Sequence, residues 1–329
     1  MVRLTNSCAP FNVLNSMKRK ILAILLLFIT AFSYAQEEAV TLSTPTGDIN
    51  GMLLLPDSGT PCPIVLIIAG SGPTDMDGNT IGTDYRNNSL RLLAEALAKN
   101  GIATLRYDKR GIGKSSLAGS KEEDLRFEHY IDDAAGWTEL LGKDKRFNRI
   151  VVAGHSEGSL IGMVASNKSP HVNAYISIAG CGSPAYEIIE EQLSQQPEQI
   201  QREAATINKE LKEGRTVENV PTYFAALYRK SVQPYLISWF CYSPPKEIAK
   251  LKIPTLILQG DKDIQVGVKE AEKLRMGRLF SSYHIIENMN HVLKECKSND
   301  IVLQLQTYKD PAIPVKQELI EYIVSFVKQ

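Results

Sequence analysis

The sequence predicts an α/β fold built on a mostly parallel sheet. Short apolar runs alternate along the chain with stretches whose apolar residues recur at helical spacing. The run at residues 64–69, Ile-Val-Leu-Ile-Ile-Ala, has no polar alternation, which is typical of a strand covered by helices on both faces. Alternating strands and helices of this kind indicate a parallel sheet with crossover helices.

Composition narrows the possible functions. The chain has 329 residues, of which 43% are hydrophobic and 22% are charged, so extended disorder is excluded. The 37 basic residues are balanced by 37 acidic ones, which leaves no basic excess to release counterions from DNA or RNA. We therefore expect a globular protein, large enough to support an enzyme cleft, without a nucleic-acid partner.

Residues 1–35 have the pattern of a leader preceded by an extension. A basic stretch at residues 18–20 is followed by an apolar run of about 12 residues and by small residues at Ser33 and Ala35. The run is shorter than the roughly 20 residues that a membrane-spanning helix needs, which disfavours the alternative of a membrane anchor. We expect translation to start at Met17, cleavage after Ala35, and an exported product, periplasmic or secreted, with no stable membrane span.

Four cysteines follow that cleavage site, namely Cys62, Cys181, Cys241 and Cys296. Export would permit disulfides, because exported proteins fold in an oxidising compartment. The four cysteines allow three pairings, among which the sequence does not choose. Buried free thiols are the alternative. None of the four has CxxC spacing, and no histidine lies at metal-ligand spacing from another ligand. We therefore expect no metal site.

The predicted elements follow in a regular order. Residues 40–43 and 51–55 flank a turn rich in Pro, Gly, Asp and Asn and predict an antiparallel hairpin. Beyond the strand at 64–69, the expected helices cover 90–99, 130–141, 159–165 and 318–327, and the expected strands cover 103–107, 150–153, 174–179, 255–259 and 283–286.

Residues 183–250 break this rhythm. They contain polar helical patterns over 187–195 and 198–213 and no apolar strand run, and they are punctuated by prolines at positions 221, 234, 244 and 245. We interpret the segment as a helical cap inserted into a core made of residues 36–182 and 251–329. Its aromatic residues are expected to pack the cap onto the core or to line an acyl pocket.

A serine motif follows one of the predicted strands. Residues 154–158, GHSEG, match G-x-S-x-G, in which the serine lies on a strained turn between a strand and a helix. A side chain at either glycine would collide with the neighbouring backbone. A serine hydroxyl is a weak nucleophile that needs a base oriented by a carboxylate. Downstream, Asp263 follows a buried strand and His291 lies in the loop after the next one.

With these residues the chain resembles the α/β-hydrolase superfamily over essentially all of residues 40–329. Residues 69–79 are similar to the corresponding loop of bacterial serine esterases and serine aminopeptidase-like hydrolases. Residues 107–115, YDKRGIGKS, resemble the D-x-R-G-x-G-x-S turn of the superfamily. The resemblance implies an α/β-hydrolase fold with eight strands, a cap between strands six and seven, and hydrolysis without a cofactor.

The resemblance also implies roles for individual residues. Ser156 corresponds to the nucleophile, His291 to the general base and Asp263 to the carboxylate that orients the base. The backbone N–H groups of Ser71 and Glu157 correspond to the oxyanion hole.

Several neighbouring residues have simpler interpretations. Asp261 is the other candidate for the carboxylate, but Asp263 matches the G-x-x-D-x-x-V spacing of the superfamily. His155 is expected to pack away from the nucleophile, and Arg110 to tie loops together. The loop at residues 75–79, DMDGN, lacks the glutamate that a calcium loop carries at twelve-residue spacing.

The sequence therefore predicts an exported carboxylesterase-type serine hydrolase. Its substrates are expected to be small-molecule acetyl, short-chain or medium-chain acyl esters, with acylated carbohydrates among the candidates. A serine peptidase or aminopeptidase of the same fold is an alternative, for which Glu187, Glu190 and Glu191 of the cap could bind an amine. A non-catalytic binding protein on this scaffold is a third reading.

Overall fold

The computed structural model describes Met1 and residues 36–119 and 121–329. The expected start at Met17, the leader and its cleavage site lie outside these residues. In the described part of the chain, no helix is both long enough and apolar enough to cross a membrane.

An eight-stranded sheet lies at the centre of residues 36–329, in the order β1-β2-β4-β3-β5-β6-β7-β8. β2 pairs antiparallel with β1 and with β4, and all the other neighbours are parallel. The predicted fold class is thus confirmed. The strands are β1 (Gln36–Thr44), β2 (Gly47–Leu55), β3 (Cys62–Ile68), β4 (Ala103–Tyr107), β5 (Phe147–His155), β6 (Ala174–Ile178), β7 (Thr255–Gly260) and β8 (Ser282–Ile286).

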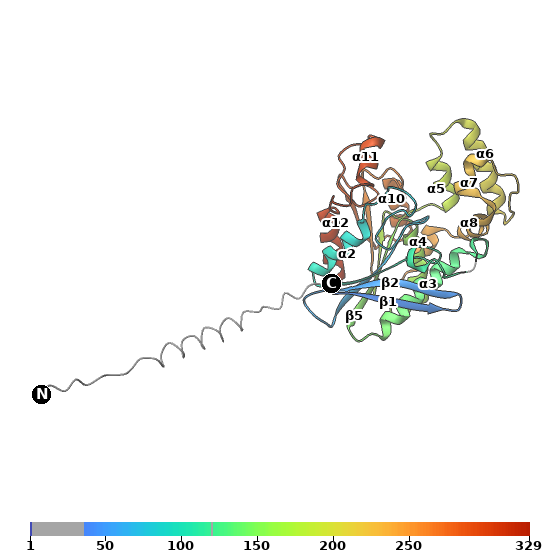
Figure 1. Ribbon diagram of the computed structural model, residues 1–329. Helices are drawn as coiled ribbons and strands as arrows, with labels where there is room; N and C mark the ends of the chain where they lie inside the picture. Colours follow the sequence, from blue (N-terminus) through green and yellow to red (C-terminus); the bar gives the residue numbers. More distant parts are fainter. Residues whose placement is uncertain (2–35, 120) are drawn as a thin grey trace. The chain divides into compact units, whose positions relative to one another are not determined.

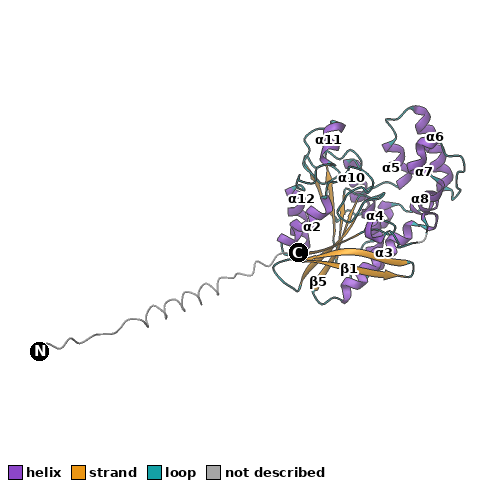
Figure 2. Ribbon diagram, viewed as in Figure 1, coloured by secondary structure: helices purple, strands orange, loops and turns teal. Residues whose placement is uncertain are grey.

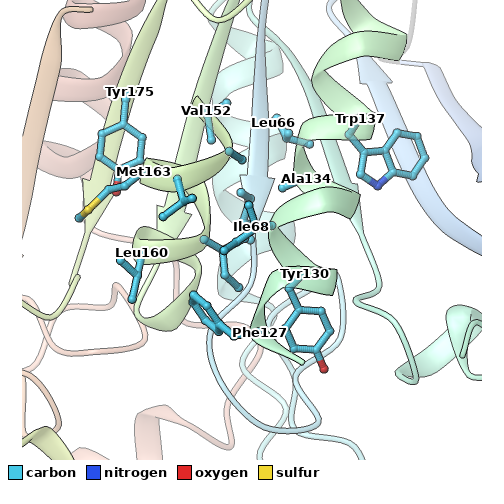
Figure 3. Close-up of a cluster of buried hydrophobic side chains, with 14 of the residues drawn as sticks. Leu66, Ile68, Phe127, Tyr130, Ala134, Trp137, Val152, Leu160, Met163 and Tyr175 are labelled. Atoms are coloured by element: carbon cyan, nitrogen blue, oxygen red, sulfur yellow. The ribbon is translucent and has the colours of Figure 1, made fainter. Parts of the chain in front are cut away.

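Helices cover both faces of the sheet (Figure 2). Side chains of β3 alternate between a core with α3 (Phe127–Lys143) and α4 (Glu157–Lys168) and a core with α2 (Ser89–Lys99) and α12 (Gln317–Val327). Leu66 and Ile68 enter the first core, beside side chains of α3 and α4 (Figure 3), whereas Val65 and Ile67 enter the second. Because both faces are buried, the strand needs no polar alternation.

Between β6 and β7 the chain forms five helices, α5 (Ala185–Gln192), α6 (Glu198–Lys212), α7 (Ala225–Tyr228), α8 (Gln233–Phe240) and α9 (Pro244–Lys250). Figure 1 shows α5 to α8 grouped together, away from α2 and α12. We refer to α5 to α8 as the cap. The structure therefore has a helical insertion at the place where the sequence breaks its alternation.

Aromatic rings pack the cap onto the body. The ring of Phe127, the first residue of α3, stacks on Trp239 of α8 with centroids 5.8 Å apart, and it also contacts Tyr235 and Tyr242. The Phe127 amide donates a 2.8 Å hydrogen bond to Ser238 Oγ. For these side chains the structure supports a packing role.

Three features differ from the sequence expectations. The hairpin turn is shorter than expected, because Asp48 and Asn50 belong to β2, where the Asn50 amide donates to Ser115 Oγ. Outside the inserted segment, two short helices were not predicted from the sequence, α10 (Val268–Gly277) and α11 (Ile301–Thr307). In α10 the only buried apolar side chains are Ala271 and Leu274, too narrow a stripe to mark a helix in the sequence.

The four cysteines Cys62, Cys181, Cys241 and Cys296 are all free thiols. Of the two readings left open by the sequence, the structure has the one without disulfides. Burial raises the pKa of the Cys62 thiol, which disfavours its reactive thiolate.

Candidate active site

Ser156 occupies a strained turn between β5 and α4, with φ 55° and ψ −121°. The flanking glycines permit this turn because there is no room for a side chain at either position. A Cβ on Gly154 would lie 2.1 Å from the carbonyl oxygen of Gly158, and one on Gly158 would lie 2.4 Å from that of Ile68. The reason given for both glycines from the sequence is thereby confirmed, and the backbone conformation exposes the serine at the carboxyl edge of the sheet.

Asp263 and His291 lie at the same edge, in the loops that follow β7 and β8. His291 Nδ1 donates a 2.7 Å hydrogen bond to Asp263 Oδ2, which also accepts one from Gln259 Nε2 at 3.0 Å. Asp263 Oδ1 accepts from the backbone amides of Gln265 and Val266 at 2.8 and 2.9 Å. Because a carboxylate can only accept here, Nδ1 of His291 carries a proton, and its Nε2 is the nitrogen available to act as a base.

The environment of Asp263 favours its charged form. Burial alone raises the pKa of this carboxyl, but the adjacent His291 ring and the hydrogen bonds from His291, Val266 and Gln265 outweigh burial and bring the pKa below its ordinary value. A charged carboxylate at this position can stabilise an imidazolium on His291.

His155 has a more specific place than the sequence indicated. Instead of packing away from the site, its ring lies 4.8 Å from that of His291, and its Nε2 donates a 2.8 Å hydrogen bond to the backbone carbonyl of His291. Burial, and then the neighbouring His291, lowers the pKa of His155 to about 3, so this ring is neutral. The sequence contains no pattern that indicates this contact, because His155 is simply the residue before Ser156 in the motif.

The loop before Ser71 passes beside the serine. A Cβ on Gly70 would lie 3.2 Å from Ser156 Cβ, so Gly70 allows a close approach of the two segments. Glu157 is the first residue of α4, and N–H groups in the first turn of a helix have no intrahelical acceptor. Both expected oxyanion-hole residues therefore lie near Ser156. Glu157 follows it in the chain, and Ser71 follows Gly70, which lies beside it in space.

Other candidates take structural positions. Asp261 Oδ1 accepts a hydrogen bond from the Asn288 amide, whereas Asp263 is the carboxylate that contacts His291. Arg110 pairs with the buried Asp133, as expected of a residue that ties loops together. In the DMDGN loop, Asp75 Oδ1 accepts from two amides of its own turn, and no group of metal-binding side chains occurs in the residues that the structure describes.

Two of the acidic cap residues already have partners. Glu191 forms a 2.7 Å ion pair with Lys269, and Glu190 accepts a hydrogen bond from Asn208 Nδ2 at 3.1 Å. Both partners compete with a substrate amine, which weakens the case for an amine-binding cluster.

Solved structures share the overall fold of this chain. Est1E from Butyrivibrio proteoclasticus, solved with ferulic acid, superposes with a TM-score of 0.59 at 19% identity, over 88% of this chain and 100% of Est1E. The chain therefore has the α/β-hydrolase fold. The chain is similar in fold also to a puromycin-hydrolyzing peptidase of Mycobacterium tuberculosis, with a TM-score of 0.57 and 16% identity over 90% of this chain and 39% of the peptidase.

Sequence comparisons add two further similarities. A family model described as serine aminopeptidase, S33, matches residues 85–236, a stretch that includes Ser156 and ends before Asp263 and His291. Esterase EstD of Thermotoga maritima is 29% identical over 260 residues, which is 74% of this chain and 57% of EstD. The match thus spans little more than half the length of that relative.

Proposed function

We propose that this protein is a serine hydrolase of the α/β-hydrolase superfamily that cleaves carboxylic esters through an acyl-enzyme on Ser156. The observation that carries the proposal is the 2.7 Å contact between Asp263 and His291 at the sheet edge where Ser156 stands on its strained turn. The names of EstD and Est1E support an ester as the substrate.

The proposed reaction has two halves. His291 Nε2 takes the proton of Ser156 Oγ as the oxygen attacks the ester carbonyl, and the resulting oxyanion accepts hydrogen bonds from the N–H groups of Ser71 and Glu157. Collapse breaks the ester bond, and His291 returns the proton to the departing alcohol. A water molecule, deprotonated by His291, then attacks the acyl-enzyme and releases the acid. Asp263 stabilises the imidazolium in both halves.

The proposal also covers the acyl group and the alcohol of the substrate. We infer small-molecule acetyl, short-chain or medium-chain acyl esters, and the presence of ferulic acid on Est1E makes feruloylated carbohydrates worth including. A panel of p-nitrophenyl esters and methyl ferulate, assayed with the wild type and Ser156→Ala, tests the proposal. We expect hydrolysis by the wild type and a loss of about 10⁶-fold in kcat for the variant. Equal rates for the two proteins would refute it.

A peptidase is the second candidate, favoured by the S33 match over residues 85–236. Aminoacyl-p-nitroanilides distinguish it from the esterase. Turnover of the anilides without turnover of any ester would replace the first proposal by the second, whereas the ion pair of Glu191 with Lys269 leads us to expect the reverse.

We also propose that the protein is exported, from the basic and apolar pattern of residues 18–35. Intact mass and N-terminal sequencing of protein from the culture medium and periplasm test this. Export predicts a chain that begins at Gln36, whereas a full-length chain confined to the cytosol would refute it.

A further inference from the structure

Lys109 is a buried charged residue that the proposed chemistry leaves unused. It lies in the turn after β4 and is 1% exposed. Its ammonium donates hydrogen bonds to the carbonyl oxygen of Gly70 at 2.5 Å and to Glu157 Oε1 at 2.9 Å, and lies 4.9 Å from the ring centroid of Tyr130. One positive charge therefore joins the two chain segments that flank Ser156.

The pair formed by Lys109 and Glu157 is almost wholly withdrawn from water, with side chains 1% and 3% exposed. Burial of a charged side chain costs on the order of several kcal/mol per ion. A protein in which two apolar side chains of similar volume replace such a pair is often as stable as the original, or more stable. A gain in stability is therefore a weak explanation for this pair. A role in fixing local geometry is the stronger one.

The geometry in question is that of the two expected oxyanion-hole amides. The carbonyl of Gly70 and the N–H of Ser71 belong to one planar, trans peptide unit, in which the two groups point in opposite directions. An ammonium that holds the carbonyl on one side therefore turns the N–H to the other side. In the described part of the chain, the Ser71 N–H has no hydrogen-bond acceptor, as an oxyanion donor requires.

The same ammonium also holds the second donor. Glu157 carries the other expected amide on its own backbone, and its side chain is the counter-ion of Lys109. The first turn of α4 is thus tied to the Gly70–Ser71 peptide through a single charged group, which limits independent movement of the two N–H groups.

The cap contributes the last contact of this network. Tyr235 of α8 is buried, and its hydroxyl donates a 2.9 Å hydrogen bond to Glu157 Oε2. Burial, and then the Glu157 carboxylate, raises the pKa of this phenol well above its ordinary value, so the hydroxyl keeps its proton and acts as the donor. Both oxygens of Glu157 are therefore engaged, one by the body and one by the cap.

We propose that Lys109 is a positioning residue for the oxyanion hole, and that Glu157 and Tyr235 hold it in place and connect it to the cap. This inference rests on the proposed function, because only a reaction with a developing oxyanion uses such a hole. Lys109 acts through the backbone amides and does not contact the substrate.

Kinetics of Lys109→Met test the inference. We expect kcat for a p-nitrophenyl ester to fall about 10- to 100-fold with KM changed less than about threefold, because the amides act mainly in the transition state. Phosphonylation of Ser156 by a fluorophosphonate probe should slow by a similar factor. Tyr235→Phe, which removes only the cap contact, should give a smaller loss of about two- to tenfold.

Arg110→Met is the matched control. Arg110 is the next residue, is also buried and also pairs with a buried carboxylate, that of Asp133, but it contacts Thr46 and Asp133 instead of the oxyanion loop. It should lose stability and keep the wild-type kcat. An equal loss of kcat in both variants would mean that any buried charge in this turn matters, and would overturn the inference.

A triple variant separates positioning from folding. Lys109→Met, Glu157→Met and Tyr235→Phe together replace the network by apolar groups and leave no unpaired charge, so we expect a thermal unfolding temperature near or above that of the wild type. Its kcat and phosphonylation rate should stay low. Wild-type rates in the triple variant would refute the role of Lys109, whereas failure of the probe to label Ser156 of the wild type would refute the proposed function itself.

Discussion

The carboxyl edge of the sheet, in the body, and the outer face of the cap hold their charged groups in different ways. At the carboxyl edge of the sheet, the side chain of Asp263 is 1% exposed and accepts four hydrogen bonds. On the cap, the pair of Arg202 with Glu198 has side chains 67% and 80% exposed, and Arg215 is 54% exposed beside Glu210. Exposed pairs contribute about 0–1 kcal/mol each, so they fix little.

This difference separates two tasks of the molecule. The sheet edge fixes a few polar groups in one geometry, which the proposed acyl transfer requires, whereas the exposed ion pairs of the cap fix little. The two regions meet at the aromatic packing around Phe127 and at the hydrogen bond from Tyr235 to Glu157. Substitutions of the buried polar groups that contact the Ser156 turn, Asp263 or His291 should therefore act on kcat, and substitutions on the outer face of the cap should act on neither kcat nor stability.

The largest effect is expected for Asp263→Asn. An asparagine cannot stabilise an imidazolium on His291 and can favour the wrong tautomer of the ring, so we expect kcat to fall by about 10³- to 10⁴-fold. Steady-state kinetics on a p-nitrophenyl ester measure the loss. Asp261→Asn is the control, since its carboxylate contacts Asn288 rather than His291. A larger loss of kcat for Asp261→Asn than for Asp263→Asn would mean that Asp261, and not Asp263, orients His291.

The same carboxylate should make stability depend on pH. Because the pKa of Asp263 is lower in the folded protein than in the unfolded chain, its contribution to stability is complete above the unfolded pKa of about 4 and is lost as the pH falls through the folded pKa. Urea unfolding between about pH 6 and pH 3 should show a smaller acid-dependent loss in Asp263→Asn than in the wild type. Parallel curves would contradict the lowered pKa.

A smaller effect is expected for His155→Phe. The substitution leaves the backbone carbonyl of His291 without its buried donor, which should lower the free energy of unfolding by about 1–3 kcal/mol. The loosened His291 loop should lower kcat by about tenfold. His284→Phe is the control, because His284 stacks on Tyr322 and not on His291. An unchanged kcat in His155→Phe would mean that His155 only packs in the core and does not position His291.

The smallest effect is expected on the cap. Arg215→Ala removes the pairs with Glu210 and Glu213, yet it should change the free energy of unfolding by less than about 0.5 kcal/mol. Its kcat should equal that of the wild type. A loss comparable with that of His155→Phe would remove the distinction between body and cap.

Much of the fold could be predicted from the sequence because its signals are local. The apolar run of β3 is continuous since Val65 and Ile67 are buried on one face and Leu66 and Ile68 on the other. The strained turn at Ser156 is marked by two glycines that have no alternative. The thin apolar stripe of α10 leaves no comparable signal, which is why that helix was not expected.

The supporting contacts of the candidate site could not be predicted in the same way. Lys109 and Glu157 lie 48 positions apart, and His155 lies 136 positions from the residue whose carbonyl it binds. Such pairs are set by tertiary packing, and a single sequence contains no pattern that joins them. Lys109 was visible only as the variable position of the D-x-R-G turn, with no charge partner to indicate its role.

A crystal structure of the protein phosphonylated on Ser156 tests the central claim most directly. The account predicts that the phosphoryl oxygen lies about 2.7–3.1 Å from the backbone nitrogens of both Ser71 and Glu157, with His291 Nε2 within hydrogen-bond reach of Ser156 Oγ. An adduct on another residue, or a phosphoryl oxygen turned toward solvent away from both amides, would contradict it.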